Sequence, residues 1–311
     1  MIQIEILLFG RFSFRYQGVE LAGLDLAKVQ ELLCYLLLYR NRPHAREALA
    51  GLLWGDSPAV QAKKQLRQTL WQLQSALGRL GDELLSTFLA VESDWICLNL
   101  TPAITLDIDQ FEHVATLAKG IPGHEFDCQQ YAVVANAVQL YRGDLLEGQY
   151  QDWCLYEREY LQNTYLTLLD KLMDHCTLHR DYEAGLEYGA RALRLDRARE
   201  RTQRQMIYLY YLLGDRTGAL RQYQRCVTAL REELAVEPAA LTLQLYHQIR
   251  SDLPGEPVAT LPTQAPQPAP QLFLALEHLQ HLQATLNHVQ ANLTQDIQII
   301  YFALKSGYVP Q

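Results

Sequence analysis

A run of amide and cationic side chains lies between residues 61 and 72. Around it, Leu66, Leu70, Leu73 and Leu77 recur every three or four residues, which predicts a helix with one apolar stripe. At about 100° per residue, the opposite side of this helix carries polar and aromatic residues: Gln61, Lys63, Lys64, Arg67, Gln68, Trp71 and Gln72. Gln can pair with adenine, and Lys or Arg can bind guanine or phosphate. The pattern therefore favours a helix that reads the major groove of double-stranded DNA.

The charge balance supports a local polyanion site rather than a basic protein as a whole. The chain of 311 residues has a net charge of −8. Residues 40–79, however, carry seven basic residues against two acidic ones, a net charge of +5. Arg42 and Arg46 belong to this excess and precede the amphipathic helix. We expect both to contact DNA beside the helix, because a local positive surface attracts a polyanion whatever the total charge.

The elements around this helix follow the order of a winged helix-turn-helix. Alternating apolar residues predict a small antiparallel sheet before residue 18. Helices are then expected at 26–39, 46–54 and 60–80, of which the last two form the helix-turn-helix. Two β runs, 87–91 and 95–98, predict a hairpin wing. Residues 1–107 are thus predicted to be an α+β DNA-binding domain, whose third helix and wing hold phosphates with Lys and Arg.

Residues 108–250 are predicted to be an all-helical domain with an internal repeat. The segment beginning Asp181-Tyr182 aligns with the segment beginning Asp215-Arg216, an offset of 34 residues. This is the period of a tetratricopeptide repeat. We expect each Asp to cap the N-terminus of its helix. The whole chain is therefore mainly α, with a small β part near its start.

The remaining residues predict a linker and one further helix. Residues 251–271 contain six of the chain's 12 prolines, which is typical of an extended, semi-rigid linker. In residues 272–311, an apolar seam follows heptad spacing, and its proposed contact residues are Leu279, Leu282, Leu286, Val289 and Leu293. An exposed seam of this kind favours pairing into a homodimer. The alternative is a helix that docks on its own repeat domain.

Other chemistry finds little support in the sequence. The six cysteines form no CxxC pair, which favours reduced thiols in a cytoplasmic protein. His175 and His179 are four residues apart but lack the Glu of an HExxH motif. Without a catalytic constellation or metal-ligand spacing, we expect no enzyme activity, cofactor or metal. The sequence contains no run of 18 apolar residues, so we predict no membrane span.

The first ~250 residues resemble the bacterial transcriptional activator domain proteins, a group that includes antibiotic-pathway regulators of the actinomycete type. The resemblance rests on joint order and spacing of several stretches: Leu8 to Phe12, Arg46 to Ala50 with Leu52 to Trp54, Leu66 to Gln68 with Leu70 and Leu73, Tyr141 to Gly148, Trp153 with Glu157 to Glu159, and Arg231 to Leu234 running into Val236 to Pro238. It implies an OmpR-type winged helix followed by a tetratricopeptide-like domain. It also implies sequence-specific promoter binding, usually to direct repeats, and recruitment of RNA polymerase.

Some residues depart from the family pattern, and two other functions remain open. Ala45 stands where the family often has a Ser or Thr cap, and Gln72 and Gln74 replace commonly basic residues. The loss of two charges predicts a shallower salt dependence of DNA binding. One alternative is a tetratricopeptide adaptor whose N-terminal module binds protein. The other is a small-molecule sensor, for which the aromatic residues are Tyr208, Tyr210 and Tyr211.

Overall fold

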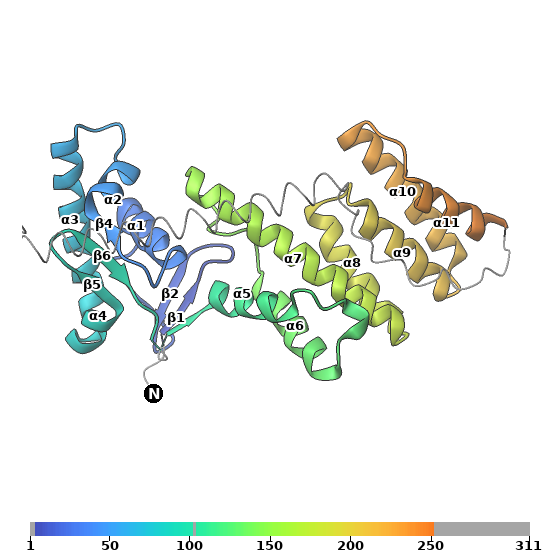
Figure 1. Cartoon of the computed structure of the whole chain (residues 1–311), viewed down its shortest axis with the longest axis horizontal. Coiled ribbons are helices and arrows are strands. Elements are labelled where there is room, and N and C mark those ends of the chain that lie inside the picture. The colour runs from blue at the N-terminus through green and yellow to red at the C-terminus, as the bar shows by residue number, and fades with distance from the viewer. Residues whose placement is uncertain (1–3, 102–103, 252–311) are drawn as a thin grey trace, which may run out of the picture. The chain divides into compact units, whose positions relative to one another are not determined.

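The computed structural model describes residues 4–101 and 104–251 (Figure 1). The predicted linker beyond residue 251 and the predicted pairing helix at 272–311 lie outside the described residues. Within the described part, strands interspersed with helices come first, and a series of helices without strands follows. This order agrees with the predicted fold class, mainly α with a small β part near the N-terminus.

The N-terminal sheet has four strands in the order β3-β2-β1-β7. β1 (Ile4–Leu7) pairs antiparallel with β2 (Ser13–Tyr16), which pairs with β3 (Val19–Glu20). Ile4, Ile6 and Phe14 point into the core, as the alternating pattern predicts. The predicted antiparallel pairing of the first strands is confirmed, and β7 (Ile104–Leu106) joins β1 in parallel as a further strand that was not predicted. The partner strand lies about a hundred residues further along the chain, where no local pattern indicates the pairing.

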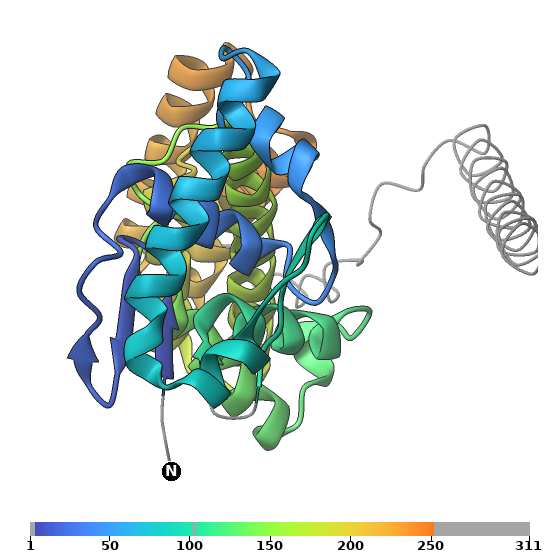
Figure 2. The same ribbon diagram turned by 90° about the vertical axis from the view of Figure 1, so that its left-hand side faces the viewer.

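Three helices build the helix-turn-helix part, as the sequence predicts. α1 (Ala27–Leu38) is followed by the short strand β4 (His44–Ala45), α2 (Arg46–Leu53) and α3 (Ala59–Leu77). A short 3-10 turn, Gly78–Leu80, ends α3. Leu66, Leu70, Leu73 and Leu77 of α3 are buried in the core. Their burial fixes which side of α3 faces outward, and Figure 2 shows this helix beside α2.

The wing is a hairpin of β5 (Leu89–Val91) and β6 (Trp95–Leu98), and β4 joins it in a three-stranded sheet of order β4-β6-β5. The predicted start of the first wing strand at Thr87 is wrong. Thr87 and Phe88 instead end the helix α4 (Asp82–Phe88). Phe88 is fully buried, and its ring centroid lies 6.2 Å from that of Phe14 in an edge arrangement. This packing outweighs the β propensity of the two residues.

The helical domain begins directly after β7. It comprises α5 (Asp107–Ala118), a 3-10 turn at Gly123–Glu125, α6 (Cys128–Leu140), α7 (Asp152–Leu178), α8 (Tyr182–Leu195), α9 (Glu200–Leu212), α10 (Arg216–Leu234) and α11 (Ala240–Ser251). The helices α8 and α10 are the corresponding helices of the predicted repeat. Asp215 caps α10 by accepting a hydrogen bond from the amide of Gly218. Asp181 makes no such side-chain bond to α8, so the prediction of two equivalent caps holds only for Asp215.

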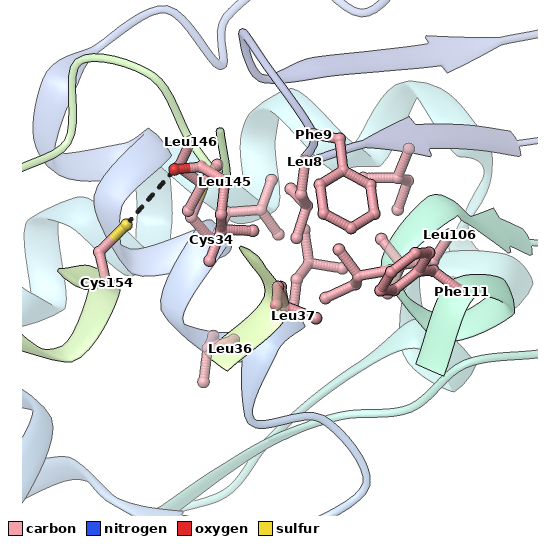
Figure 3. Close-up of a cluster of buried hydrophobic side chains, with 14 of the residues drawn as sticks. Leu8, Phe9, Cys34, Leu36, Leu37, Leu106, Phe111, Leu145, Leu146 and Cys154 are labelled. Atoms are coloured by element: carbon pink, nitrogen blue, oxygen red, sulfur yellow. Dashed lines mark hydrogen bonds between the residues drawn. The ribbon is translucent and has the colours of Figure 1, made fainter. Parts of the chain in front are cut away.

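A continuous hydrophobic core joins the winged helix to the helical domain (Figure 3). Leu8 and Phe9, which follow β1, pack in this cluster with Leu37 of α1, Phe111 of α5 and Leu145. The Phe9 and Phe111 rings lie 5.2 Å apart between centroids, nearly perpendicular. The predicted division after residue 107 falls at the start of α5, within this shared core.

Polar contacts also connect the winged helix to the helical domain, at the place that we call the joint. The Asp107 carboxylate is buried and accepts hydrogen bonds from the amides of Leu8, Phe9 and Ile108, at 2.8 to 2.9 Å. Burial raises the pKa of Asp107, and the three amide bonds lower it by less. Asp107 is therefore more than the helix start that its sequence position suggests, because it ties the end of β1 to α5.

Candidate nucleic-acid interface

The outward side of α3 carries the predicted DNA-contacting residues. Most of these are exposed, and only Gln72 is half-buried: Gln61, Lys63, Lys64, Arg67, Gln68 and Trp71. The sequence left open whether Trp71 is covered by the wing, and with 68% of its surface exposed it is not covered within the described part of the chain. The helix therefore presents amides, cations and one indole ring together on a solvent-facing surface, which we call the α3 face.

The cations of the α3 face differ in what they already contact. Lys63 forms an ion pair with Glu47 of α2, with 2.9 Å between Nζ and Oε1. That contact lowers the pKa of Glu47, chiefly through the hydrogen bond from Lys63. Among the residues described here, Lys64 and Arg67 have no ion-pair or hydrogen-bond partner. Lys64 and Arg67 are thus the cations that can bind phosphate without breaking an existing contact.

Arg46 and Arg42, the other two cations predicted to contact DNA, each have contacts within the protein. The guanidinium of Arg46 donates to the carbonyl of Glu92 at 3.1 Å, and its amide donates to the carbonyl of Asp94 at 2.9 Å. Arg46 therefore holds the tip of the wing against the start of α2, a role that its predicted DNA contact did not include. The guanidinium of Arg42 lies 4.6 Å from the Tyr39 ring centroid, in cation–π geometry.

The wing does not supply the cations that were expected of it. Its hairpin, residues 89–98, contains no Lys or Arg, and its turn carries Glu92 and Asp94 instead. The side chain of Trp95 is about half exposed. Two carboxylates at the turn repel phosphate, so the expectation that wing cations hold the DNA backbone is wrong. Any phosphate contact of this module would therefore involve cations outside the hairpin, such as those of α3.

Arg40 also does not contribute to the local positive surface that the sequence suggests. Its guanidinium pairs with Asp109 at 2.7 Å and with Glu112 at 2.8 Å, and only 12% of its side chain is exposed. The two carboxylates raise the pKa of Arg40 against the opposing effect of burial. Both belong to α5, so Arg40 joins α1 to the helical domain. The net charge of residues 40–79 overstates the charge that a ligand meets.

Other kinds of site find little support in the described residues. No group of three His, Cys, Asp or Glu side chains there could hold a metal ion. The rings of His175 and His179 stack with centroids 3.9 Å apart, and His175 is buried. Tyr208, Tyr210 and Tyr211 pack against the cluster around Ile207 and Leu245. No helix in residues 4–101 and 104–251 is both long and apolar enough to cross a membrane.

Comparisons with known proteins match both parts of this architecture. Residues 106–250 match the family model of the bacterial transcriptional activator domain. The transcriptional regulatory protein MoaR1 of Mycobacterium tuberculosis is 27% identical, and the match covers 81% of this chain and 80% of that protein. MoaR1 of Mycobacterium bovis is also 27% identical, with the same coverage.

The solved structures add a likeness of fold. The structure of Mycobacterium tuberculosis EmbR, determined in complex with a low affinity phosphopeptide, superimposes with a TM-score of 0.63 at 21% sequence identity. The superposition covers 82% of this chain and 67% of EmbR. It spans more than the helical domain alone. Residues 106–250 thus match a bacterial transcriptional activator domain, and most of the chain is similar to a protein described as a transcriptional regulator.

Proposed function

We propose that this chain regulates transcription by binding double-stranded DNA through the α3 face. The observation that carries the proposal is the exposure of Lys64 and Arg67, unpaired within the described residues, beside the exposed amides of Gln61 and Gln68. Cations without partners bind phosphates at the lowest cost, and glutamine amides read base edges. The shared core supports the same conclusion, because it fixes α3 on the rest of the fold.

In this mechanism, the residues that position the helix on the DNA backbone differ from those that recognise the bases. Lys64 and Arg67 hold the backbone and set the register of α3 in the major groove. Gln61 and Gln68 then meet base edges, and Trp71 packs on a sugar or a thymine methyl group. Arg46 acts through the wing, which it holds in place. Because the wing turn is acidic, it lies away from the phosphates.

The experiment is DNA binding measured by fluorescence anisotropy, with the duplex upstream of the protein's own operon. We expect Lys64→Ala/Arg67→Ala to weaken binding at least about tenfold. The slope of log K against log salt should also fall by about two, since two phosphate contacts disappear. The matched control is Lys119→Ala/Arg250→Ala, which removes two exposed cations of the helical domain. Equal affinities of the double variant and the wild type would contradict the assignment and favour a protein-binding N-terminal module.

The same proposal includes two partners. We propose that the protein acts in the cytoplasm as an activator that contacts RNA polymerase, which the family resemblance implies. We also propose that the seam Leu279, Leu282, Leu286, Val289 and Leu293 forms a homodimer, which would place two winged helices on adjacent half-sites. Deletion of residues 272–311 should give a monomer in light scattering and weaker DNA binding. A truncated protein that stays dimeric would contradict this role.

A further inference from the structure

A groove of about 640 Å³ lies between α8 and α10 of the helical domain. Figure 1 shows these helices beside α9, which contributes to the floor of the groove. Four arginines and three glutamines line it, together with a threonine and small and apolar side chains: Arg194, Arg197, Arg221, Arg225, Gln203, Gln222 and Gln224. We call it the arginine groove. It lies outside the α3 face and takes no part in the proposed DNA contact.

The local structure explains why the arginines gather there. Arg221 and Arg225 are four residues apart on α10, and residues at this interval lie on one side of a helix. Arg194 lies in the last turn of α8, and Arg197 follows in the loop that leads to α9. Ala190 and Ala229 are small and also line the groove, so the space between the helices is left open and the long side chains border it.

The floor of the groove is polar and fixed. Gln203 and Gln222 are each 3% exposed. Gln222 Nε2 donates to Gln203 Oε1 at 2.6 Å, and Gln203 Nε2 donates to the carbonyl of Arg197 at 2.7 Å. Buried amides that are bonded in this way hold their orientation. The groove therefore has a defined hydrogen-bonding floor, which distinguishes it from a gap between solvated side chains.

The arginines differ in availability. Arg197 pairs with Glu232 at 3.1 Å and with Glu233 at 3.6 Å, which neutralises the end of the groove. Arg194 and Arg221 are exposed and have no ion-pair or hydrogen-bond partner among the described residues. No carboxylate is among the residues that line the groove. It is a local positive site in a domain, residues 108–250, whose net charge is −4.

The positive surface continues beyond the groove. Arg194 also lines a second hollow of about 340 Å³, together with Arg142 and Arg191. Two adjoining hollows that share one arginine suit an elongated anion better than a compact one. Both are open to solvent, whereas small-molecule sites enclose most of their ligand. A guanidinium binds a carboxylate through two parallel hydrogen bonds, which side chains of an acidic peptide can satisfy in succession.

We propose that the arginine groove binds an acidic segment of a protein partner, with carboxylates on Arg194, Arg221 and Arg225. Charge complementarity selects this occupant, and the buried glutamine floor accommodates side chains that reach between the helices. A DNA backbone could bind surface arginines but has no side chain to enter the groove. The proposal does not depend on DNA binding by the α3 face.

The test uses the full chain and fluorescence anisotropy with a fluorescein-labelled hexaglutamate peptide at low salt. A labelled hexaglutamine peptide is the uncharged probe. We expect hexaglutamate to bind and hexaglutamine not to bind. Arg194→Glu/Arg221→Glu should weaken hexaglutamate binding at least about tenfold, since two attractions become repulsions. The matched control Lys119→Glu/Arg250→Glu makes the same change of net charge at exposed cations outside the groove and should change binding less than about twofold.

Two further variants keep the outcome interpretable. Thr228→Trp fills the groove without changing its charge and should also weaken peptide binding. Lys64→Ala/Arg67→Ala should leave peptide binding unchanged while weakening DNA binding, so failure of one proposal is distinguishable from failure of the other. Circular dichroism melting checks that each variant is folded.

Three results would overturn the proposal. Equal weakening by the groove pair and the control pair would mean that only net charge matters. A tenfold loss of DNA binding in the groove pair, with peptide binding retained, would assign the groove to nucleic acid. Displacement of hexaglutamate by inorganic pyrophosphate at concentrations that leave the ionic strength unchanged would assign it to a small anion.

Discussion

The α3 face and the joint between winged helix and helical domain both contain charged residues, but only the α3 face has cations without a partner among the described residues. At the joint, Arg40 is bound by two carboxylates of α5, and Asp107 is bound by three amides. On the α3 face, Lys64 and Arg67 have no partner among the described residues. One basic stretch of sequence thus contains cations of two kinds: some hold the fold together, and others are available to a ligand.

The largest effect is expected at the joint. Asp107→Ala leaves the amides of Leu8, Phe9 and Ile108 buried without an acceptor. Orphaned buried donors cost about 1–3 kcal/mol each, so we expect a loss of about 3–5 kcal/mol in the free energy of unfolding. Urea denaturation followed by circular dichroism measures it. A loss below about 1 kcal/mol would show that the joint does not depend on this carboxylate.

An intermediate effect is expected for base reading by the α3 face. Gln68→Ala should lower affinity for the preferred duplex by about tenfold and relax the preference at one base pair, because a bidentate contact to a base contributes about 1–3 kcal/mol of discrimination. Selection of bound duplexes from a random library measures the preference. An unchanged base preference would remove Gln68 from the reading residues and leave it as a solvated side chain.

The smallest effect is expected at Glu47, whose ion pair with Lys63 holds one cation of the α3 face. Glu47→Gln removes a negative charge beside the α3 face and frees Lys63 from its ion pair. DNA binding should become about two- to fivefold tighter at low salt and approach wild type at high salt, because salt screens exposed charges. Anisotropy at two salt concentrations measures this. Weaker binding in the variant would mean that the Glu47 contact orients Lys63 productively.

The same contrast explains what could be predicted from the sequence. The α3 face follows from a local pattern, because burial of four leucines at helical spacing fixes the outward residues. The partners of Arg40 lie 69 and 72 residues away, and Asp107 reaches an amide 99 residues away. No local pattern indicates such contacts, so the sequence alone does not distinguish Arg40 from the exposed cations.

The wing shows a different reason for error. Its expected cations came from the general design of a winged helix, although residues 89–98 contain none. Likewise, Thr87 and Phe88 have β propensity, but burial of Phe88 against Phe14 places them in α4. The order of the motifs therefore predicts which elements form the winged helix. It does not predict the charge of the wing or the end of α4, which depend on individual residues and their tertiary contacts.

The central claim is that DNA contacts the α3 face, and lysine acetylation with and without bound duplex tests it most directly. Lys64 on α3 and Lys119 in the helical domain are both exposed, so each should react in the free protein. Mass spectrometry after brief acetylation should show that DNA protects Lys64 at least about fivefold and leaves Lys119 unchanged. Equal reactivity of Lys64 with and without bound DNA would contradict the account.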